Sequence, residues 1–161
     1  MRKTGDSSSS LVSPFVVAVD HREGHPFLFV GTTGDSRRHY RPIIVKTERK
    51  TLATGDYSII GMEDKIAIER KSIEDLFSTL TAGRERFEKE LSRLSVMEYA
   101  CVIVEGDLVP HVYLNPPLLS RAIPKSIGRS VLAYTQKFRT VHWVFGHDHV
   151  WSSNICYYLL N

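Results

Sequence analysis

Residues 55–75 restrict the possible folds more than any other segment of this 161-residue chain, because two strand-like runs flank a polar turn and lead into a helix start. The turn reads Gly-Met-Glu-Asp, and a four-residue hairpin loop of this kind pairs Ile60 with Lys65. In that register Asp56 lies directly across from Glu69. Like charges that face each other across a sheet are destabilising, so this arrangement needs a cation between the two carboxylates or a pKa shift that neutralises one of them.

The polar face of the predicted hairpin carries the groups for one kind of chemistry. Side chains alternate between the two faces of a strand, so Asp56, Glu69 and Lys71 share one face, with Lys71 roughly 6.5 Å beyond Glu69. Carboxylate oxygens suit the hard ions Mg²⁺ and Mn²⁺, which lower the pKa of a bound water. A nearby ammonium adds positive charge next to the attacking water. The pattern therefore predicts metal-dependent hydrolysis of phosphodiester bonds, and the alternative is a surface hairpin with ordinary exposed charges.

Several short motifs occur in an order and spacing that resemble those of a known family. They are Val-Ala-Val-Asp20-His-Arg-Glu23, Gly55-Asp56-Tyr57, Glu69-Arg70-Lys71 followed by Asp75, Gly83-Arg84, and Val-Ile-Val-Glu105-Gly106. Over about residues 15–160 the chain is similar to the XPF-type nuclease domain, in a stand-alone form. The resemblance implies a restriction-endonuclease-like fold, whose metal site uses an Asp and then a Glu-x-Lys on the next strand. These are the residues that the hairpin register brings together.

The resemblance also implies a role for individual residues of these motifs. Asp56, Glu69 and Asp20 are expected to bind Mg²⁺ or Mn²⁺. Lys71 is expected to assist the attacking water, and Glu23 is expected to line the same catalytic site. The implied cofactor is therefore a divalent metal ion, and these five residues are candidate catalytic residues.

Four further residues each have two interpretations. Strand alternation turns Arg70 away from the carboxylate pair, so we expect it to support the site through an ion pair or to contact a DNA phosphate. Asp75 is either catalytic or structural, because Ser72-Ile-Glu-Asp75 matches a capping box at a helix start. Arg84 and Arg86 follow the motif on a predicted helix, and we expect phosphate contacts there rather than a solvated basic face.

Charge and cysteine content add little to the case for a nucleic-acid ligand. Lys and Arg exceed Asp and Glu by 21 to 18, a net charge of +3 that is only mildly basic. A local basic cluster, Arg37-Arg38-His-Tyr-Arg41, is a further candidate for phosphate contact. Cys101 and Cys156 show neither metal nor disulfide spacing and are predicted to be small core residues. Asp148, between two histidines, is predicted to cap a helix rather than to bind metal.

Apolar runs alternate with amphipathic stretches along the chain and predict an α/β fold with a mixed central β-sheet flanked by helices. Strands are expected at Phe15–Val19, Ile43–Glu48, 56–60, 65–71, Ala100–Val104 and Val141–Phe145. Helices are expected from Ile73 to Leu94, with Gly83 as a kink, from Pro124 or Ser126 to Phe138, and from Asp148 onward. Residues 1–13 are expected to form a disordered N-terminal arm, and residues 14–161 the nuclease domain.

The leading functional prediction is a divalent-metal-dependent endonuclease that cuts DNA, and the resemblance implies branched or flapped DNA in repair or recombination. Two alternatives stay open. One is a non-catalytic DNA-binding scaffold subunit, and the other is a resolvase or restriction-type nuclease of the same fold. No apolar run approaches the length of a membrane span, so we expect a soluble, intracellular protein.

The C-terminal segment carries more apolar side chains than a chain end usually displays. Those at helical spacing are Trp151, Ile155, Tyr158 and Leu159, with Tyr157 and Leu160 beside them. One face of such a helix must pack on the sheet, and we expect the remainder, including Tyr157 and Leu160, to meet the same surface of a second copy. We therefore expect a homodimer through the C-terminal helices, and the alternative is a monomer that packs this helix into its own core.

Overall fold

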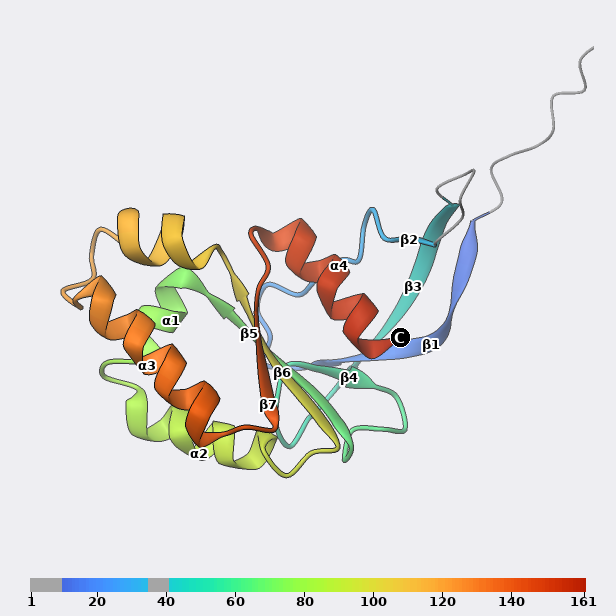
Figure 1. Cartoon of the computed structure of the whole chain (residues 1–161). Coiled ribbons are helices and arrows are strands. Elements are labelled where there is room, and N and C mark those ends of the chain that lie inside the picture. The colour runs from blue at the N-terminus through green and yellow to red at the C-terminus, as the bar shows by residue number, and fades with distance from the viewer. Residues whose placement is uncertain (1–9, 35–40) are drawn as a thin grey trace, which may run out of the picture.

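The computed structural model describes residues 10–34 and 41–161. Its strands are β1 (Leu11–Asp20), β2 (Thr33–Gly34), β3 (Arg41–Lys50), β4 (Tyr57–Ile59), β5 (Ile66–Ser72), β6 (Tyr99–Glu105) and β7 (Val141–Phe145). Across the described residues they form one mixed sheet in the order β2-β3-β1-β4-β5-β6-β7 (Figure 1). The predicted α/β fold with a mixed central sheet is therefore confirmed.

Parallel and antiparallel pairs divide the sheet. β5, β6 and β7 run parallel to one another, and β1 runs parallel to β3, whereas β4 is antiparallel to both β1 and β5. β6 reads Tyr-Ala-Cys-Val-Ile-Val-Glu, and its five inner residues are all buried. A continuous apolar run of this kind is typical of a parallel strand that is covered on both faces.

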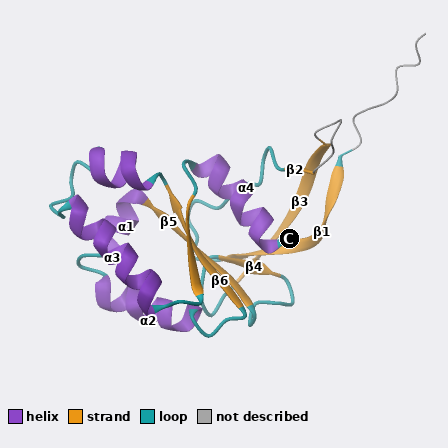
Figure 2. Cartoon of the chain, in the orientation of Figure 1, coloured by secondary structure: helices purple, strands orange, loops and turns teal. Residues whose placement is uncertain are grey.

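Helices supply that cover on both faces of the sheet (Figure 2). They are α1 (Ile73–Thr79), α2 (Arg84–Leu94), the π-helix η1 (Leu108–Leu114), α3 (Pro124–Lys137) and α4 (His149–Leu160). α1, α2 and α3 share a core with Ala67 and Val102, whereas α4 shares a second core with Ile68 and Cys101. Because neighbouring strand residues point to opposite faces, the two cores lie on opposite sides of the sheet.

The first strand begins earlier than the sequence predicts. β1 starts at Leu11, inside the segment expected to be a disordered arm, because Leu11 pairs with Ile43 of β3. The rest of that arm, residues 1–9, lies outside the described residues, as do Arg37 and Arg38 of the basic cluster. What we expect of them stays a prediction.

The single kinked helix expected from Ile73 to Leu94 is instead two helices. α1 ends at Thr79, and α2 begins directly after Gly83. The Gly83 backbone lies so close to α1 that an added Cβ would be 3.1 Å from the Thr79 Cα. Glycine therefore permits a tight turn rather than a kink, and the turn makes α1 and α2 separate walls of the site described below.

Other elements agree with the sequence. α3 begins at Pro124, and Asp148 caps α4 by accepting a hydrogen bond from the Trp151 N–H. Cys101 and Cys156 are buried as expected, and burial raises the pKa of the Cys101 thiol to about 12. Within the described ranges, none of the helices combines the length and the apolar character that crossing a membrane requires.

The last helix divides its apolar residues between core and surface. Tyr157 and Leu160 are buried in the core beneath α4, so the expectation that they face a second copy is wrong. The aromatic rings of Trp151 and Tyr158 are left at the surface, with exposed fractions of 60 % and 49 %. A homodimer through α4 stays a prediction, and these two rings and Val150, which is 57 % exposed, are the apolar side chains that α4 leaves at the surface.

Candidate active site

The β4–β5 hairpin has the register that the sequence predicts. Tyr57 pairs with Ile68, so the next position along the two strands sets Asp56 opposite Glu69. Gly55 permits this approach, because its φ is +73° and an added Cβ would lie 3.0 Å from the Ile68 carbonyl oxygen. Only glycine adopts this backbone without strain beside such a close neighbour. The Asp56 N–H therefore reaches the same carbonyl oxygen at 2.8 Å, and this bond fixes Asp56 at the start of β4.

Asp56 and Glu69 form a coupled acidic pair inside the protein. Burial and then the Glu69 charge raise the pKa of Asp56 to about 8, although the Arg70 backbone N–H, 2.8 Å from Oδ2, opposes the shift. Burial also raises the pKa of Glu69, which is only 7 % exposed. Lys71 Nζ lies 2.6 Å from Glu69 Oε1, and this ion pair favours the ionised form of Glu69. Burial and the like charges therefore favour a proton on this pair in the metal-free protein.

Lys71 stays charged in this environment. Burial would lower the pKa of its ammonium, but Glu69 and Asp56 outweigh burial and raise it. The ammonium nitrogen also lies 5.2 Å from the centre of the Phe87 ring, within the range of a cation–π contact. Lys71 is thus a fixed positive charge beside the acidic pair.

Glu69 and Lys71 open onto a cavity of about 310 Å³. Its other walls are Arg22, Thr79, Arg86, Phe87, Glu90 and Arg93. Two carboxylates and four cationic side chains therefore meet in one recess. This composition suits a phosphate group that binds next to a metal cation. The carboxylates attract the cation, and the cationic side chains attract the phosphate.

Asp20 lies beside the pair, but protein donors occupy its carboxylate. Oδ1 accepts from the Arg22 N–H at 2.8 Å and from Arg22 Nε at 2.7 Å, and Oδ2 accepts from the Leu52 N–H at 2.8 Å. Burial raises the pKa of Asp20, but these bonds outweigh burial and bring it down to about 2. Asp20 thus ties the end of β1 to the segment that leads to Asp56, and its role as a metal ligand stays a prediction.

The acidic pair fits a divalent ion, although it is not a complete cage. Within residues 10–34 and 41–161, no group of three or more His, Cys, Asp and Glu side chains is arranged to hold a metal ion alone. Mg²⁺ is commonly bound through one or two carboxylates, with water and substrate phosphate as the other ligands. Asp56 and Glu69 are hard oxygen donors whose mutual repulsion a cation relieves, so these two residues match that mode of binding.

Arg70 supports the site through ion pairs, which is one of the two roles expected of it. Its Nε and Nη2 donate to Glu105 at 2.6 and 2.9 Å, and its Nη1 lies 3.2 Å from Glu23 Oε1. Burial would lower the pKa of the guanidinium, but the two carboxylates raise it. Glu23 is also close enough to raise the pKa of Asp56. The network therefore borders the acidic pair on the other face of β5.

The structure separates the remaining predicted residues. The Ser72 hydroxyl caps α1 by accepting from the Asp75 N–H at 3.1 Å, and Asp75 itself is exposed. This geometry matches the structural interpretation of Asp75, and its catalytic role stays a prediction. Arg84 turns toward α3, with its guanidinium 5.3 Å from the Tyr134 ring centre, whereas Arg86 lines the cavity. Of the two arginines, Arg86 is the one placed beside the acidic pair.

Glu90 of α2 is a residue of the site that the sequence did not reveal. Its Oε1 accepts from Thr54 Oγ1 at 2.5 Å and from the Gly55 N–H at 3.3 Å, and its Oε2 pairs with Arg93. Burial raises the pKa of Glu90, but these partners outweigh burial and lower it. Glu90 thereby anchors the chain just before Asp56. In the sequence, Glu90 is marked only by its place on α2 next to the buried residues Phe87 and Leu91. Many helix residues share such a place, so it does not indicate a site residue.

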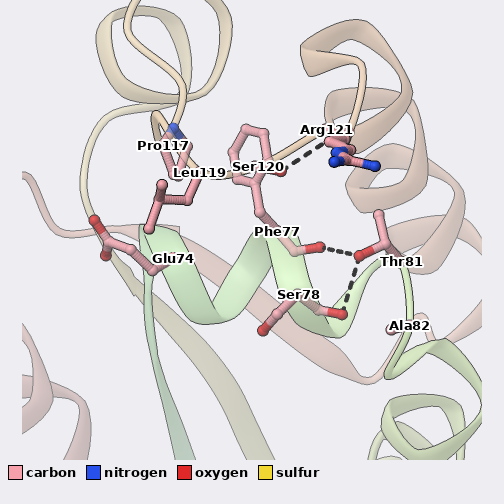
Figure 3. A pocket seen from close by; sticks show the side chains of 10 residues that line it. Glu74, Phe77, Ser78, Thr81, Ala82, Pro117, Leu119, Ser120 and Arg121 are labelled. Carbon is pink, nitrogen blue, oxygen red and sulfur yellow. Dashed lines mark hydrogen bonds between the residues drawn. The ribbon is translucent and has the colours of Figure 1, made fainter.

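A larger cavity, of about 610 Å³, lies between α1 and residues 117–122 (Figure 3). It is lined by Glu74, Phe77, Ser78, Thr81, Ala82, Pro117, Leu119, Ser120, Arg121 and Ala122. The Thr81 hydroxyl is already used, because it donates to the Phe77 carbonyl oxygen at 2.7 Å. Neither the acidic pair nor Lys71 lines this cavity, so we assign the chemistry to the smaller one.

Comparison with known proteins agrees with this fold. A family model described as the ERCC4 domain matches residues 19–155. XPF from Aeropyrum pernix is similar in structure, with a TM-score of 0.63 and 23 % sequence identity over 89 % of this chain and 62 % of that one. The same protein in complex with DNA gives a TM-score of 0.65 and 24 % identity over 91 % and 63 %. The chain thus spans about three fifths of the length of these structures. No curated protein matches it significantly.

Proposed function

The chain belongs to the ERCC4 domain family, and on this basis we propose that it is a divalent-metal-dependent endonuclease that hydrolyses phosphodiester bonds in DNA. Members of this family are nucleases. The observation that carries the proposal is the pair of the partly buried Asp56 and the buried Glu69, with the Lys71 ammonium 2.6 Å from Glu69. A fold gains no stability from two facing carboxylates, so their presence supports a catalytic use.

The acidic pair and Lys71 each have a part in the proposed reaction. Asp56 and Glu69 would hold Mg²⁺ or Mn²⁺, which when bound acts as a Lewis acid toward the phosphate and lowers the pKa of a water. Both carboxylates would be ionised with the ion bound, because two negative charges are stable together beside a cation, and the proton of the pair would pass to solvent. Glu69 also fixes the Lys71 ammonium, which stabilises the negative charge that develops on the phosphate.

The arginines of the cavity support DNA as the substrate. Arg22, Arg86 and Arg93 line its walls, and arginine–phosphate contacts supply much of the affinity of proteins for DNA. The Arg22 side chain is 72 % exposed even though it pairs with Asp20, so its guanidinium is accessible to a ligand. XPF from Aeropyrum pernix binds DNA in its solved complex, which supports the same class of ligand here.

We extend the proposal to branched or flapped DNA in repair or recombination, as the resemblance to XPF-type nucleases implies. A resolvase or restriction-type enzyme would share the same acidic pair, so the choice of DNA structure has to come from experiment. A non-catalytic scaffold is the weaker candidate. A chain that only binds DNA has no use for a carboxyl group whose pKa is raised to about 8 by burial and a like charge.

Cleavage of a panel of labelled DNAs tests the proposal. Duplex, single-stranded, 3′-flap, splayed-arm and four-way DNA are each incubated with the protein in Mg²⁺, Mn²⁺ or EDTA. We expect cleavage in either metal ion, none in EDTA, and faster cutting of the flap or splayed arm than of plain duplex. Glu85→Gln serves as the matched control for site variants, because Glu85 is an exposed carboxylate of α2 that pairs with Lys89. If none of the five DNAs is cut in either Mg²⁺ or Mn²⁺, the proposal is contradicted.

A further inference from the structure

Four ionisable side chains from distant parts of the sequence form a continuous series of contacts beside the acidic pair. Arg70 of β5 lies at its centre and contacts Glu23 after β1 and Glu105 at the end of β6. The fourth member is His149, the first residue of α4, whose Nδ1 lies 2.7 Å from Glu105 Oε1. The series therefore links the start of the C-terminal helix to the middle of the sheet.

Burial and charge make His149 an important member of this series. The side chains of Glu23, Arg70 and Glu105 are only 6 %, 11 % and 11 % exposed. Two carboxylates share one guanidinium, so these three groups carry an excess of negative charge away from water. An ionised carboxylate can only accept, so the contact with His149 is a hydrogen bond donated from Nδ1. His149 thus supplies Glu105 with a donor that Arg70 alone does not provide.

The series reaches the acidic pair through Arg70 and through an aromatic stack. The backbone N–H of Arg70 donates to Asp56 Oδ2 at 2.8 Å, so the placement of this residue bears directly on the carboxylate. The Phe27 ring lies 5.1 Å from the His149 ring and 5.8 Å from the Arg70 guanidinium. It also stacks on Tyr57, the neighbour of Asp56, at 4.9 Å. A shift of His149 can therefore displace Asp56 in two ways, through Arg70 or through the stack of Phe27 on Tyr57.

The loop before α4 holds His149 firmly. Asp148 caps the helix through the Trp151 N–H at 2.8 Å. His147 adopts a φ of 64°, which is uncommon for a residue with a side chain, and its Nδ1 lies 2.6 Å from Asp107 Oδ2. The two residues that precede His149 are thus fixed, and a rigid mount of this kind suits a residue that positions another group.

We infer that His149 is a positioning residue, which fixes Glu105 and through it the side chain of Arg70, the residue whose backbone N–H bonds Asp56. Its contribution to cleavage rests on the proposed function, whereas its hold on Arg70 does not. Replacing a group that orients a catalytic or metal-binding residue typically lowers activity by about 10- to 100-fold. His149→Leu should therefore slow single-turnover cleavage by at least about 10-fold, with little change in DNA affinity.

A nuclear magnetic resonance experiment tests the hold on Arg70 without DNA or metal. In the wild-type protein, the Arg70 Nε–H bonds Glu105 at 2.6 Å in a buried site, so we expect a separate signal that is protected from solvent exchange. His149→Leu should broaden or shift this signal. His149→Asn should restore it, because the asparagine Nδ2 occupies about the place of the histidine Nδ1. Val150→Ala is the control, because Val150 follows His149 in α4 and its side chain is 57 % exposed.

The outcomes separate the two proposals. An Arg70 Nε–H signal that is unchanged in His149→Leu would overturn the positioning role. If that variant does not fold, His149→Ala carries the same test, with the asparagine variant again as the rescue. A response of the Arg70 signal in a protein that cleaves no DNA would support the positioning role and reject the nuclease. Equal slowing of cleavage by His149→Leu and Val150→Ala would also count against His149.

Discussion

Replacing Asp56 with asparagine should remove a large part of the pH dependence of stability of the metal-free protein. Burial and the Glu69 charge raise the pKa of Asp56 to about 8 from the value of 3.8 that it has when unperturbed. Between these two pH values the folded protein holds a proton that the unfolded chain has released. The free energy of unfolding therefore falls as the pH rises, by about 1.4 kcal/mol per pH unit for one proton.

The interval from pH 5 to pH 7 lies inside this window. Over that range, Asp56 should lower the free energy of unfolding of the wild type by about 2.5 kcal/mol. Asparagine does not titrate, and its side-chain oxygen still accepts the Arg70 N–H that lies 2.8 Å from Asp56 Oδ2. As the pH rises from 5 to 7, the free energy of unfolding of Asp56→Asn should therefore increase relative to that of the wild type by about 2.5 kcal/mol. The stabilising effect of the proton is greatest below pH 4 and is lost as the pH rises through 8.

Urea unfolding in EDTA at pH 5, 6 and 7 measures this difference. Titrating groups remote from Asp56 contribute equally to both proteins, so they cancel when the variant is compared with the wild type at each pH. Asp64→Asn is the matched control, because Asp64 is an exposed carboxylate in the loop of the same hairpin. Parallel stability curves for the wild type and Asp56→Asn would refute the account of a buried, proton-sharing pair.

Three further predictions concern metal, DNA and self-association. Mg²⁺ should raise the melting temperature of the wild type but not of the Asp56→Asn/Glu69→Gln double variant, and equal shifts in thermal scans would place the ion elsewhere. Arg86→Ala should weaken binding to every DNA by a similar factor and reduce the slope of log affinity against log salt by about 0.9. Arg84→Ala should change the slope less, because Arg84 packs on α3, and the reverse order would reject this assignment. Sedimentation at micromolar concentration should show a dimer that Trp151→Glu dissociates, and a monomer of 18.3 kDa throughout would exclude it.

The central part of the site could be predicted because local rules determine it. A four-residue loop fixes the register of a hairpin, and strand alternation then decides which side chains share a face. Asp56, Glu69 and Lys71 follow from these two rules alone. The cap of α4 at Asp148 was equally local, because it depends on one side chain and the N–H three residues later.

The parts that the sequence missed depend on contacts between distant segments. Asp20 meets the Leu52 N–H, and Glu90 meets Thr54, across more than 30 residues in each case. The periodicity of apolar residues along the chain does not predict such long-range contacts. The contact of Arg84 with Ser130 of α3 also joins distant segments, and the DNA contact predicted for Arg84 stays a prediction. The apolar character of Tyr157 was visible in the sequence, whereas the face of α4 that meets the sheet was not.

Single-turnover cleavage by Asp56→Asn is the most direct test of the claim that the acidic pair performs the chemistry. The wild type, Asp56→Asn and the surface control Glu85→Gln are compared in Mg²⁺ on the DNA that the wild type cuts fastest. We expect Asp56→Asn to be slower by at least about 10²-fold, the scale for removing one preorganised electrostatic group, while it binds the DNA as tightly as the control. Glu69→Gln and Lys71→Ala should behave in the same way. Cleavage by Asp56→Asn at the rate of the wild type would contradict the account.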